Sequence, residues 1–219
     1  MDTILTLKQK KALKCIAQTN LAKKFYFTGG TALAHVYLHH RKSEDLDFFN
    51  EQEFDPQQVA STLKTLQHTL RFISFDYQQS FNRNIYMLRF DQSKFLKLEF
   101  TFFPFHQIEK PSEKEGLLID SVLDIATNKL FTIAQNPRGR DYFDLYCIIQ
   151  KYHYAMENLR MFAKQKFDWH IDPLQLGSRF HEVTQHLDDP ILVQYVEHAL
   201  VIKFFQDEAM KFASQIIDR

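Results

Sequence analysis

The spacing of apolar residues in the first half of the chain changes between that of helices and that of strands. Over residues 5–20 the apolar residues recur at roughly helical spacing, while the lysines fall mostly elsewhere on the wheel, which predicts an amphipathic helix. Residues 25–27 form a short aromatic run suited to a buried strand. Asp55 and Pro56 supply an N-cap and a first-turn proline, and predict a helix that runs to about Leu70.

Three β-like runs follow this helix, over residues 72–78, 84–90 and 94–103, with short polar turns between them. Strands joined by short turns are usually antiparallel neighbours, so we expect a mixed sheet. The segment 104–115 is rich in Pro, Ser, Lys and Glu and is typical of a linker.

The second half of the chain has helical spacing throughout. The predicted helices cover residues 119–134, 145–152, 156–166 and 190–217, with Pro190 as a first-turn proline and loops at 169–177 and 187–190. We therefore expect an α+β protein. A small mixed β-sheet core with flanking helices would cover residues 1–110, and a helical half over residues 111–219 would complete an active-site cleft.

A glycine turn follows the first predicted strand. Gly29 and Gly30 let the backbone turn sharply and approach a ligand closely, and Thr28 or a glycine would cap the helix that begins near Thr31. Because helix N-termini bind anions, this turn predicts a phosphate site.

Asp45 and Asp47 lie two residues apart on the next predicted strand. This spacing puts both carboxylates on one face, with Cα atoms roughly 7 Å apart, within reach of one or two hard cations such as Mg²⁺. Taken alone, the turn or the acidic pair is commonly structural. A phosphate site beside a divalent-metal site, however, is the minimum requirement for phosphoryl or nucleotidyl transfer.

Glu99 is an acidic residue in the otherwise apolar run over residues 94–103. A buried carboxylate is costly without a partner, so a metal ion or another cation beside it is one interpretation. The alternative is an exposed glutamate on the outer face, with Lys97 as its neighbour on that face.

Three more residues of the second half are candidates. Lys129 lies on or beside the apolar stripe of its helix, where a solvated lysine is unexpected. Asp141 and Asp144 are three residues apart in the first turn of another helix, where acidic residues suit the helix dipole. That placement alone explains both acids structurally.

Composition narrows the class of protein. The 27 basic and 27 acidic residues give a formal net charge of zero, so no overall field favours nucleic acid and any RNA contact would be a local patch. Cys15 and Cys147 lack a partner motif, which suits reduced thiols. Since no apolar run approaches the ~20 residues that span a bilayer, and no signal peptide is visible, we expect a cytoplasmic protein without membrane contact.

The motifs together resemble the AbiEii/AbiGii toxin family of nucleotidyltransferase-like proteins, within the DNA polymerase β-like superfamily. The resemblance covers roughly residues 20–150. It rests on the segment from Phe27 to Leu33, the segment from Arg41 to Phe49, and Lys129 followed by the segment from Arg140 to Tyr146.

The resemblance implies a role for each matching residue. Thr28, Gly29, Gly30 and Thr31 would hold an NTP, Asp45 and Asp47 would bind Mg²⁺ or Mn²⁺, and Glu99 would stand where a third metal carboxylate, usually Asp, is found. Lys129 would contact phosphate and Asp141 would be a catalytic or orienting acid. Arg41 and Ser43 match the pattern, with Arg41 offsetting phosphate charge.

The function implied is two-metal nucleotidyl transfer from an NTP to an RNA, such as tRNA, or to a protein. Family members act as toxins of toxin–antitoxin or phage-defence systems, which implies a cognate antitoxin as partner. Two alternatives stay open: a catalytically silent module that binds RNA or a partner protein, and a phosphotransferase that uses the same metal site.

Overall fold

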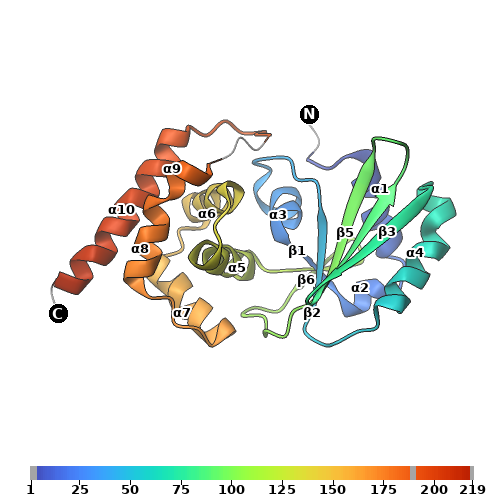
Figure 1. Cartoon of the computed structure of the whole chain (residues 1–219), viewed down its shortest axis with the longest axis horizontal. Coiled ribbons are helices and arrows are strands. Elements are labelled where there is room, and N and C mark those ends of the chain that lie inside the picture. The colour runs from blue at the N-terminus through green and yellow to red at the C-terminus, as the bar shows by residue number, and fades with distance from the viewer. Residues whose placement is uncertain (1–3, 188–190, 218–219) are drawn as a thin grey trace. The chain divides into compact units, whose positions relative to one another are not determined.

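The computed structural model describes residues 4–187 and 191–217, with the backbone alone for residues 213–217 (Figure 1). Its contacts divide the chain into two compact units. The first comprises residues 4–37 and 42–121, and the second comprises residues 38–41 together with the described residues from Val122 onward. None of the helices within the described ranges is both long and apolar enough to cross a bilayer.

The first unit is built on a seven-stranded mixed sheet with the order β3-β4-β5-β2-β1-β7-β6. The pairs β2–β5 and β1–β7 are parallel, and the other neighbours are antiparallel. The strands are β1 (Tyr26–Thr28), β2 (Leu46–Asn50), β3 (Ser74–Ser80), β4 (Arg83–Arg89), β5 (Phe95–Phe102), β6 (Ser112–Lys114) and β7 (Leu117–Ile119). The mixed sheet is confirmed.

Helices cover the apolar face of this sheet. Phe48 of β2 stacks on Phe100 of β5 with ring centroids 5.0 Å apart, and the hydroxyl of Tyr86 in β4 donates to the carbonyl of Pro56 at 2.8 Å. The helical elements of this unit are α1 (Leu7–Ile16), α2 (Leu21–Lys24), α3 (Gly29–Ala32), the π-helix η1 (Leu33–Leu38) and α4 (Pro56–Leu70). Figure 1 shows α1 and α4 together on one side of the sheet. The opposite face carries the acidic residues of β2 and β5.

The second unit is helical. Tyr142 packs edge-on against Phe205 with ring centroids 5.0 Å apart, and Lys166 pairs with Asp124 at 2.6 Å with both side chains fully buried. The helices are α5 (Val122–Gln135), α6 (Gly139–Tyr152), α7 (Met156–Phe167), α8 (Pro173–His181), α9 (Val183–His186) and α10 (His198–Ile217). A mixed-sheet core followed by a helical half is therefore the observed fold class.

The first predicted helix is too long. A capping box, in which the Thr6 hydroxyl accepts from the Gln9 backbone and the Gln9 side chain accepts from the Thr6 backbone, begins α1 at Leu7. Leu7, the first residue of α1, is 85% exposed. The chain then leaves the helix after Ile16 and forms α2 separately.

The expected linker and the helix after it also differ from the structure. Part of the segment 104–115 forms β6, which pairs with β7, and β7 pairs in parallel with β1. Because Leu117–Ile119 belongs to the sheet, α5 begins at Val122 rather than at residue 119. The contacts group residues 112–121 with the sheet, and the predicted division at residue 110 stays a prediction.

Two predictions near the C-terminus, a loop and a helix start, were wrong. The predicted loop at 169–177 contains the start of α8, where the Asp172 carboxylate caps the helix by accepting from the Gln175 backbone. The last helix begins at His198, because residues 191–197 are irregular and the Val193 backbone donates to the His40 carbonyl at 2.9 Å. Pro190, the predicted first residue of that helix, lies outside the described residues.

Candidate active site

Gly29 brings the backbone of the glycine turn against the carboxylate of Asp47. Its φ of +75° lies in the left-handed region that favours glycine. A Cβ atom added at Gly29 would lie 2.5 Å from Oδ2 of Asp47, which is closer than non-bonded atoms approach. The position therefore requires glycine both for its backbone conformation and for the space that Asp47 takes.

The buried carboxylate of Asp120 accepts a hydrogen bond from the residue that precedes the glycine turn. The Thr28 hydroxyl donates to Oδ2 of Asp120 at 2.7 Å, and the Gln107 amide donates to Oδ1 of Asp120 at 2.7 Å. Thr28 has the N-cap position of α3, but its side chain does not cap the helix. The role of Asp120 at this turn has no local sequence signal, since it lies 92 residues from Thr28.

Hydrogen bonds connect the loop before β2 to the residues after the glycine turn and to α1. The buried Thr31 hydroxyl donates to the backbone carbonyl of Asp45, and the Gln9 amide donates to the carbonyls of Ser43 and Glu44 at 2.7 and 3.0 Å. The hydroxyl of Thr31 thus fixes the Asp45 backbone relative to the glycine turn. Nucleotide contacts from Thr31, Ser43 and Gly30 stay predictions.

The strand register places the acidic residues on one face of the sheet. Thr28 is paired with Asp47, and Asp47 is paired with Glu99, so these three side chains form a row across β1, β2 and β5. Asp45 lies one residue before β2. The sequence could not supply this register, because it depends on pairing between strands far apart in the chain.

Glu99 is buried, with 5% of its surface exposed, and it is bound by two cationic side chains. Arg83 donates to it through Nε at 2.6 Å and Nη2 at 2.7 Å, and the Lys97 ammonium lies 3.2 Å away. Burial would raise the pKa of Glu99, but the hydrogen bonds and charge of Arg83, together with Lys97, leave it below its ordinary value. The expected exposure of Glu99 in the alternative interpretation is wrong, whereas Lys97 is indeed its neighbour, and a cation does lie beside this carboxylate.

Lys97 connects the two acidic strands. Its ammonium lies 2.8 Å from Oδ2 of Asp45 and 3.2 Å from Oε2 of Glu99. Although burial lowers the pKa of Lys97, the hydrogen bond and charge of Asp45, together with the charges of Glu99 and Asp47, more than offset that effect and raise the pKa. Lys97 is therefore a fixed positive charge on this face.

Asp45 and Asp47 suit a magnesium ion better than Glu99 does. Within the ranges that the structure describes, no three His, Cys, Asp or Glu side chains gather closely enough to hold a metal ion. Mg²⁺ in phosphoryl-transfer sites is commonly held by one or two carboxylates, with water and substrate phosphates as its other ligands. Asp45 and Asp47 fit that donor set, although Oδ2 of Asp45 also faces the Lys97 ammonium, whereas both oxygens of Glu99 accept from Arg83.

The candidate residues of the second unit form a buried ionic network. The Lys129 ammonium lies 2.7 Å from Asp141 and 2.8 Å from Asp144, and Arg138 donates to Asp141 at 2.7 Å. Arg41 is buried and donates to both oxygens of Asp144, at 2.6 and 2.7 Å. Lys129 and Arg41 are thus engaged with carboxylates, and their predicted contacts with phosphate stay predictions.

Asp144 is the centre of this network. Burial opposes its ionisation, but the charges of Lys129 and Arg41 and the hydrogen bonds from Arg41 and His40 hold the pKa of Asp144 well below its ordinary range. The pKa of Asp141 is also lowered, since Lys129 and Arg138 outweigh its burial. Burial lowers the pKa of His40, which lies 2.8 Å from Asp144.

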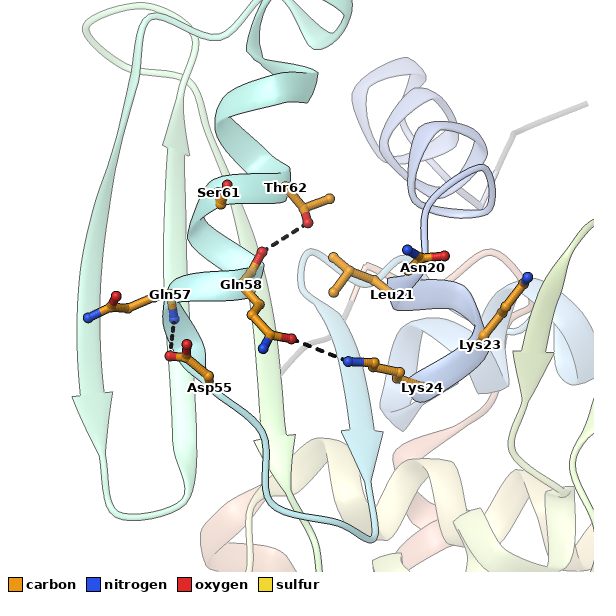
Figure 2. A pocket seen from close by; sticks show the side chains of 9 residues that line it. All are labelled: Asn20, Leu21, Lys23, Lys24, Asp55, Gln57, Gln58, Ser61 and Thr62. Atoms are coloured by element: carbon orange, nitrogen blue, oxygen red, sulfur yellow. Dashed lines mark hydrogen bonds between the residues drawn. The ribbon is translucent and has the colours of Figure 1, made fainter.

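One surface hollow of the first unit contains none of the predicted site residues. Figure 2 shows this hollow, of about 550 Å³, between α2 and the start of α4. Lys24 donates to the Gln58 side chain across it at 3.2 Å, and Asp55 accepts from the Gln57 backbone at 2.8 Å. Because Asp55 caps α4, the hollow lacks the open helix N-terminus that would favour an anion.

The chain matches the model of a known family over most of its length. The model describes the "Nucleotidyl transferase AbiEii toxin, Type IV TA system", and the match covers residues 11–212. An uncharacterized protein of Aquifex aeolicus (strain VF5) is 30% identical to this chain over 165 residues, which are 74% of this chain and 76% of that protein.

Two solved structures from Helicobacter pylori are similar in fold. One, described as a candidate nucleotidyltransferase, has a TM-score of 0.60 and 21% identity, and the match covers 96% of this chain and 94% of that one. The other, JHP933, has a TM-score of 0.59 and 21% identity, with 96% and 91% covered. At these identities the likeness shows a shared fold.

We predict that Gly29→Ala is more destabilising than Gly116→Ala. Both glycines have a φ near +75°, but a Cβ atom at Gly116 would lie 3.5 Å from its nearest neighbour, in ordinary contact. Gly116→Ala should lower the free energy of unfolding by about 1–2 kcal/mol, because alanine disfavours the left-handed conformation. Gly29→Ala should lower it by about 1–3 kcal/mol more, because its Cβ atom would overpack against Asp47. Urea unfolding measures the free energy of unfolding of both variants. Equal losses in the two variants would contradict the close approach of Gly29 to Asp47.

We also predict that Asp144→Asn lowers stability by about 3–5 kcal/mol at pH 7, because it leaves buried cations without their carboxylate. Since the folded pKa of Asp144 lies below its unfolded value, its contribution is present above about pH 4 and is lost as the pH falls towards the folded pKa. The variant should therefore lose less stability than the wild type between about pH 4 and pH 2.

The control for this experiment is Asp207→Asn, whose carboxylate is 44% exposed beside Lys203. It should change the free energy of unfolding by less than about 1 kcal/mol. Parallel acid-unfolding curves for the wild type and Asp144→Asn would show that Asp144 does not carry the pH dependence.

Proposed function

The chain belongs to the AbiEii nucleotidyl transferase toxin family, and on this basis we propose that it transfers a nucleoside monophosphate from an NTP to an acceptor with the help of a divalent metal ion. The observation that carries the proposal is the contact between Gly29 and Asp47. It puts backbone suited to phosphate directly beside a carboxylate suited to a metal, so one triphosphate would reach both.

The proposal assigns the triphosphate to the turn of Thr28, Gly29, Gly30 and Thr31. A positive φ at Gly29 and the absence of a side chain there let phosphate oxygens approach the backbone. Asp120 would support triphosphate binding indirectly, since it fixes the Thr28 side chain and hence the strand that ends in the turn.

Asp45 and Asp47 would hold Mg²⁺ or Mn²⁺, which when bound neutralises phosphate charge and orients the reacting groups. Thr31 keeps the Asp45 backbone in register with the turn, and Lys97 orients the Asp45 carboxylate. From the helical unit, the proposal assigns Lys129 to phosphate charge and Asp141 to an orienting acid. Arg41 and Ser43 are assigned to the nucleotide on the sequence pattern alone.

The acceptor that we propose is an RNA, such as tRNA, or a protein, and the cellular role is that of a toxin with a cognate antitoxin. The family description supports the toxin role. A net charge of zero provides no overall attraction for a polyanion, so an RNA acceptor would need a local basic surface.

A catalytically silent module is the second candidate. The observation in its favour is the neutralisation of Glu99 by Arg83 and Lys97, which leaves Asp45 and Asp47 as the carboxylates suited to a metal on this face. Such a module would bind a partner protein or RNA through the same fold and transfer no nucleotide.

Label transfer distinguishes the proposed function from both alternatives. Incubation of the protein with total RNA or lysate and each α-labelled NTP should label an acceptor, whereas the corresponding γ-labelled NTP should not. Asp47→Asn and Asp45→Asn should reduce transfer by at least about 100-fold, because each removes a charge that the metal requires.

The control variant is Asp76→Asn, an exposed position on β3, which should transfer label as the wild type does. Transfer from the γ-labelled NTP would identify a phosphotransferase instead. Full transfer by both site variants, with melting temperatures unchanged, would overturn the assignment of Asp45 and Asp47.

A further inference from the structure

The Lys97 ammonium lies among the carboxylates where a second metal ion would be expected. It bridges Asp45, the residue just before β2, and Glu99 of the neighbouring strand β5, at 2.8 and 3.2 Å. Its side chain is 23% exposed, and it projects from β5, which is paired on both sides by β2 and β4. The charge is therefore held in place by the sheet.

Glu99 is committed to cations of the protein. Its Oε1 accepts from Arg83 Nε at 2.6 Å and from the Thr101 hydroxyl at 3.2 Å, while its Oε2 accepts from Arg83 Nη2 at 2.7 Å. A metal ion on Glu99 would have to displace a two-pronged Arg–carboxylate pair, which is among the stronger polar contacts in proteins. Glu99 therefore acts as an anchor for Lys97 and Arg83.

The charges around Glu99 also argue against a metal ion on this carboxylate. Arg83 and Lys97 already bring two positive charges to Glu99. A divalent ion placed on Glu99 would be repelled by both of them at close range.

We propose that this chain holds one divalent ion, on Asp45 and Asp47, and that the Lys97 ammonium, anchored by Glu99, takes the place of a second. The inference rests on the proposed function and deepens it, since it concerns the cations of the same site. It replaces the two-ion arrangement expected from sequence, and it makes Lys97 a residue that sets how many metal ions the site accepts.

Binding of Mn²⁺ to the full chain tests this inference without any nucleotide or turnover. Electron paramagnetic resonance of free Mn²⁺ during a titration to millimolar metal gives the number of bound ions and their affinity. The wild type should bind one Mn²⁺ per chain. Lys97→Met should bind a second Mn²⁺ or bind the first at least tenfold more tightly, because Asp45 and Glu99 then lack the ammonium.

Two lysine variants separate the charge of Lys97 from its structural role. Lys97→Arg keeps the positive charge and should retain the wild-type stoichiometry and affinity. Lys94→Met removes a largely exposed lysine just before β5 and should also behave as the wild type. Lys97→Gln, with melting temperatures for each variant, replaces Lys97→Met if that variant does not fold.

Each result has a distinct meaning. Two ions in the wild type, or the same binding in the wild type and Lys97→Met, would overturn the inference, and the proposed function would stand if Asp47→Asn still abolished binding. Absence of Mn²⁺ binding in both the wild type and Lys97→Met would overturn the metal dependence of the proposed function, and this inference with it. One ion in the wild type together with gained binding in Lys97→Met supports both.

Discussion

The close approach of the Gly29 backbone to the Asp47 carboxylate is the constraint on which the candidate site depends. Antiparallel pairing of β1 and β2 places Thr28 opposite Asp47, and the turn then continues past that carboxylate with no room for a Cβ atom. Thr31 connects the same turn to the Asp45 backbone. The glycine turn and the acidic pair are thus held together by contacts within the same unit.

Both units balance buried carboxylates with cations of the protein. Glu99 is bound by Arg83 and Lys97, and Asp144 is bound by Arg41 and Lys129. Such pairs add little net stability over apolar packing, but removing one partner is costly, so they restrict which charges the site tolerates. In the sheet unit we propose that this restriction determines which carboxylates are left for a metal ion.

Local signals in the sequence predicted a large part of the fold. The cap at Asp55 and the antiparallel run of β3, β4 and β5 were predicted correctly, because they depend on neighbouring residues. Contacts between distant segments could not be predicted. The Arg83–Glu99 pair depends on strand register, the Thr28–Asp120 hydrogen bond joins residues 92 positions apart, and β7 joins the sheet through its parallel pairing with the distant strand β1. No local pattern distinguishes these residues from exposed or helix-capping ones.

The candidate site follows the same division. The glycine turn and the acidic pair are visible as motifs, whereas the burial and pairing of Glu99 become visible only in three dimensions.

Calorimetry of each NTP, with and without Mg²⁺, tests the central claim most directly. Joint binding by the glycine turn and the acidic pair predicts that an NTP binds only when Mg²⁺ is present and that Asp47→Asn abolishes this binding. Binding that is equally tight without Mg²⁺, or no binding at millimolar NTP, would contradict it.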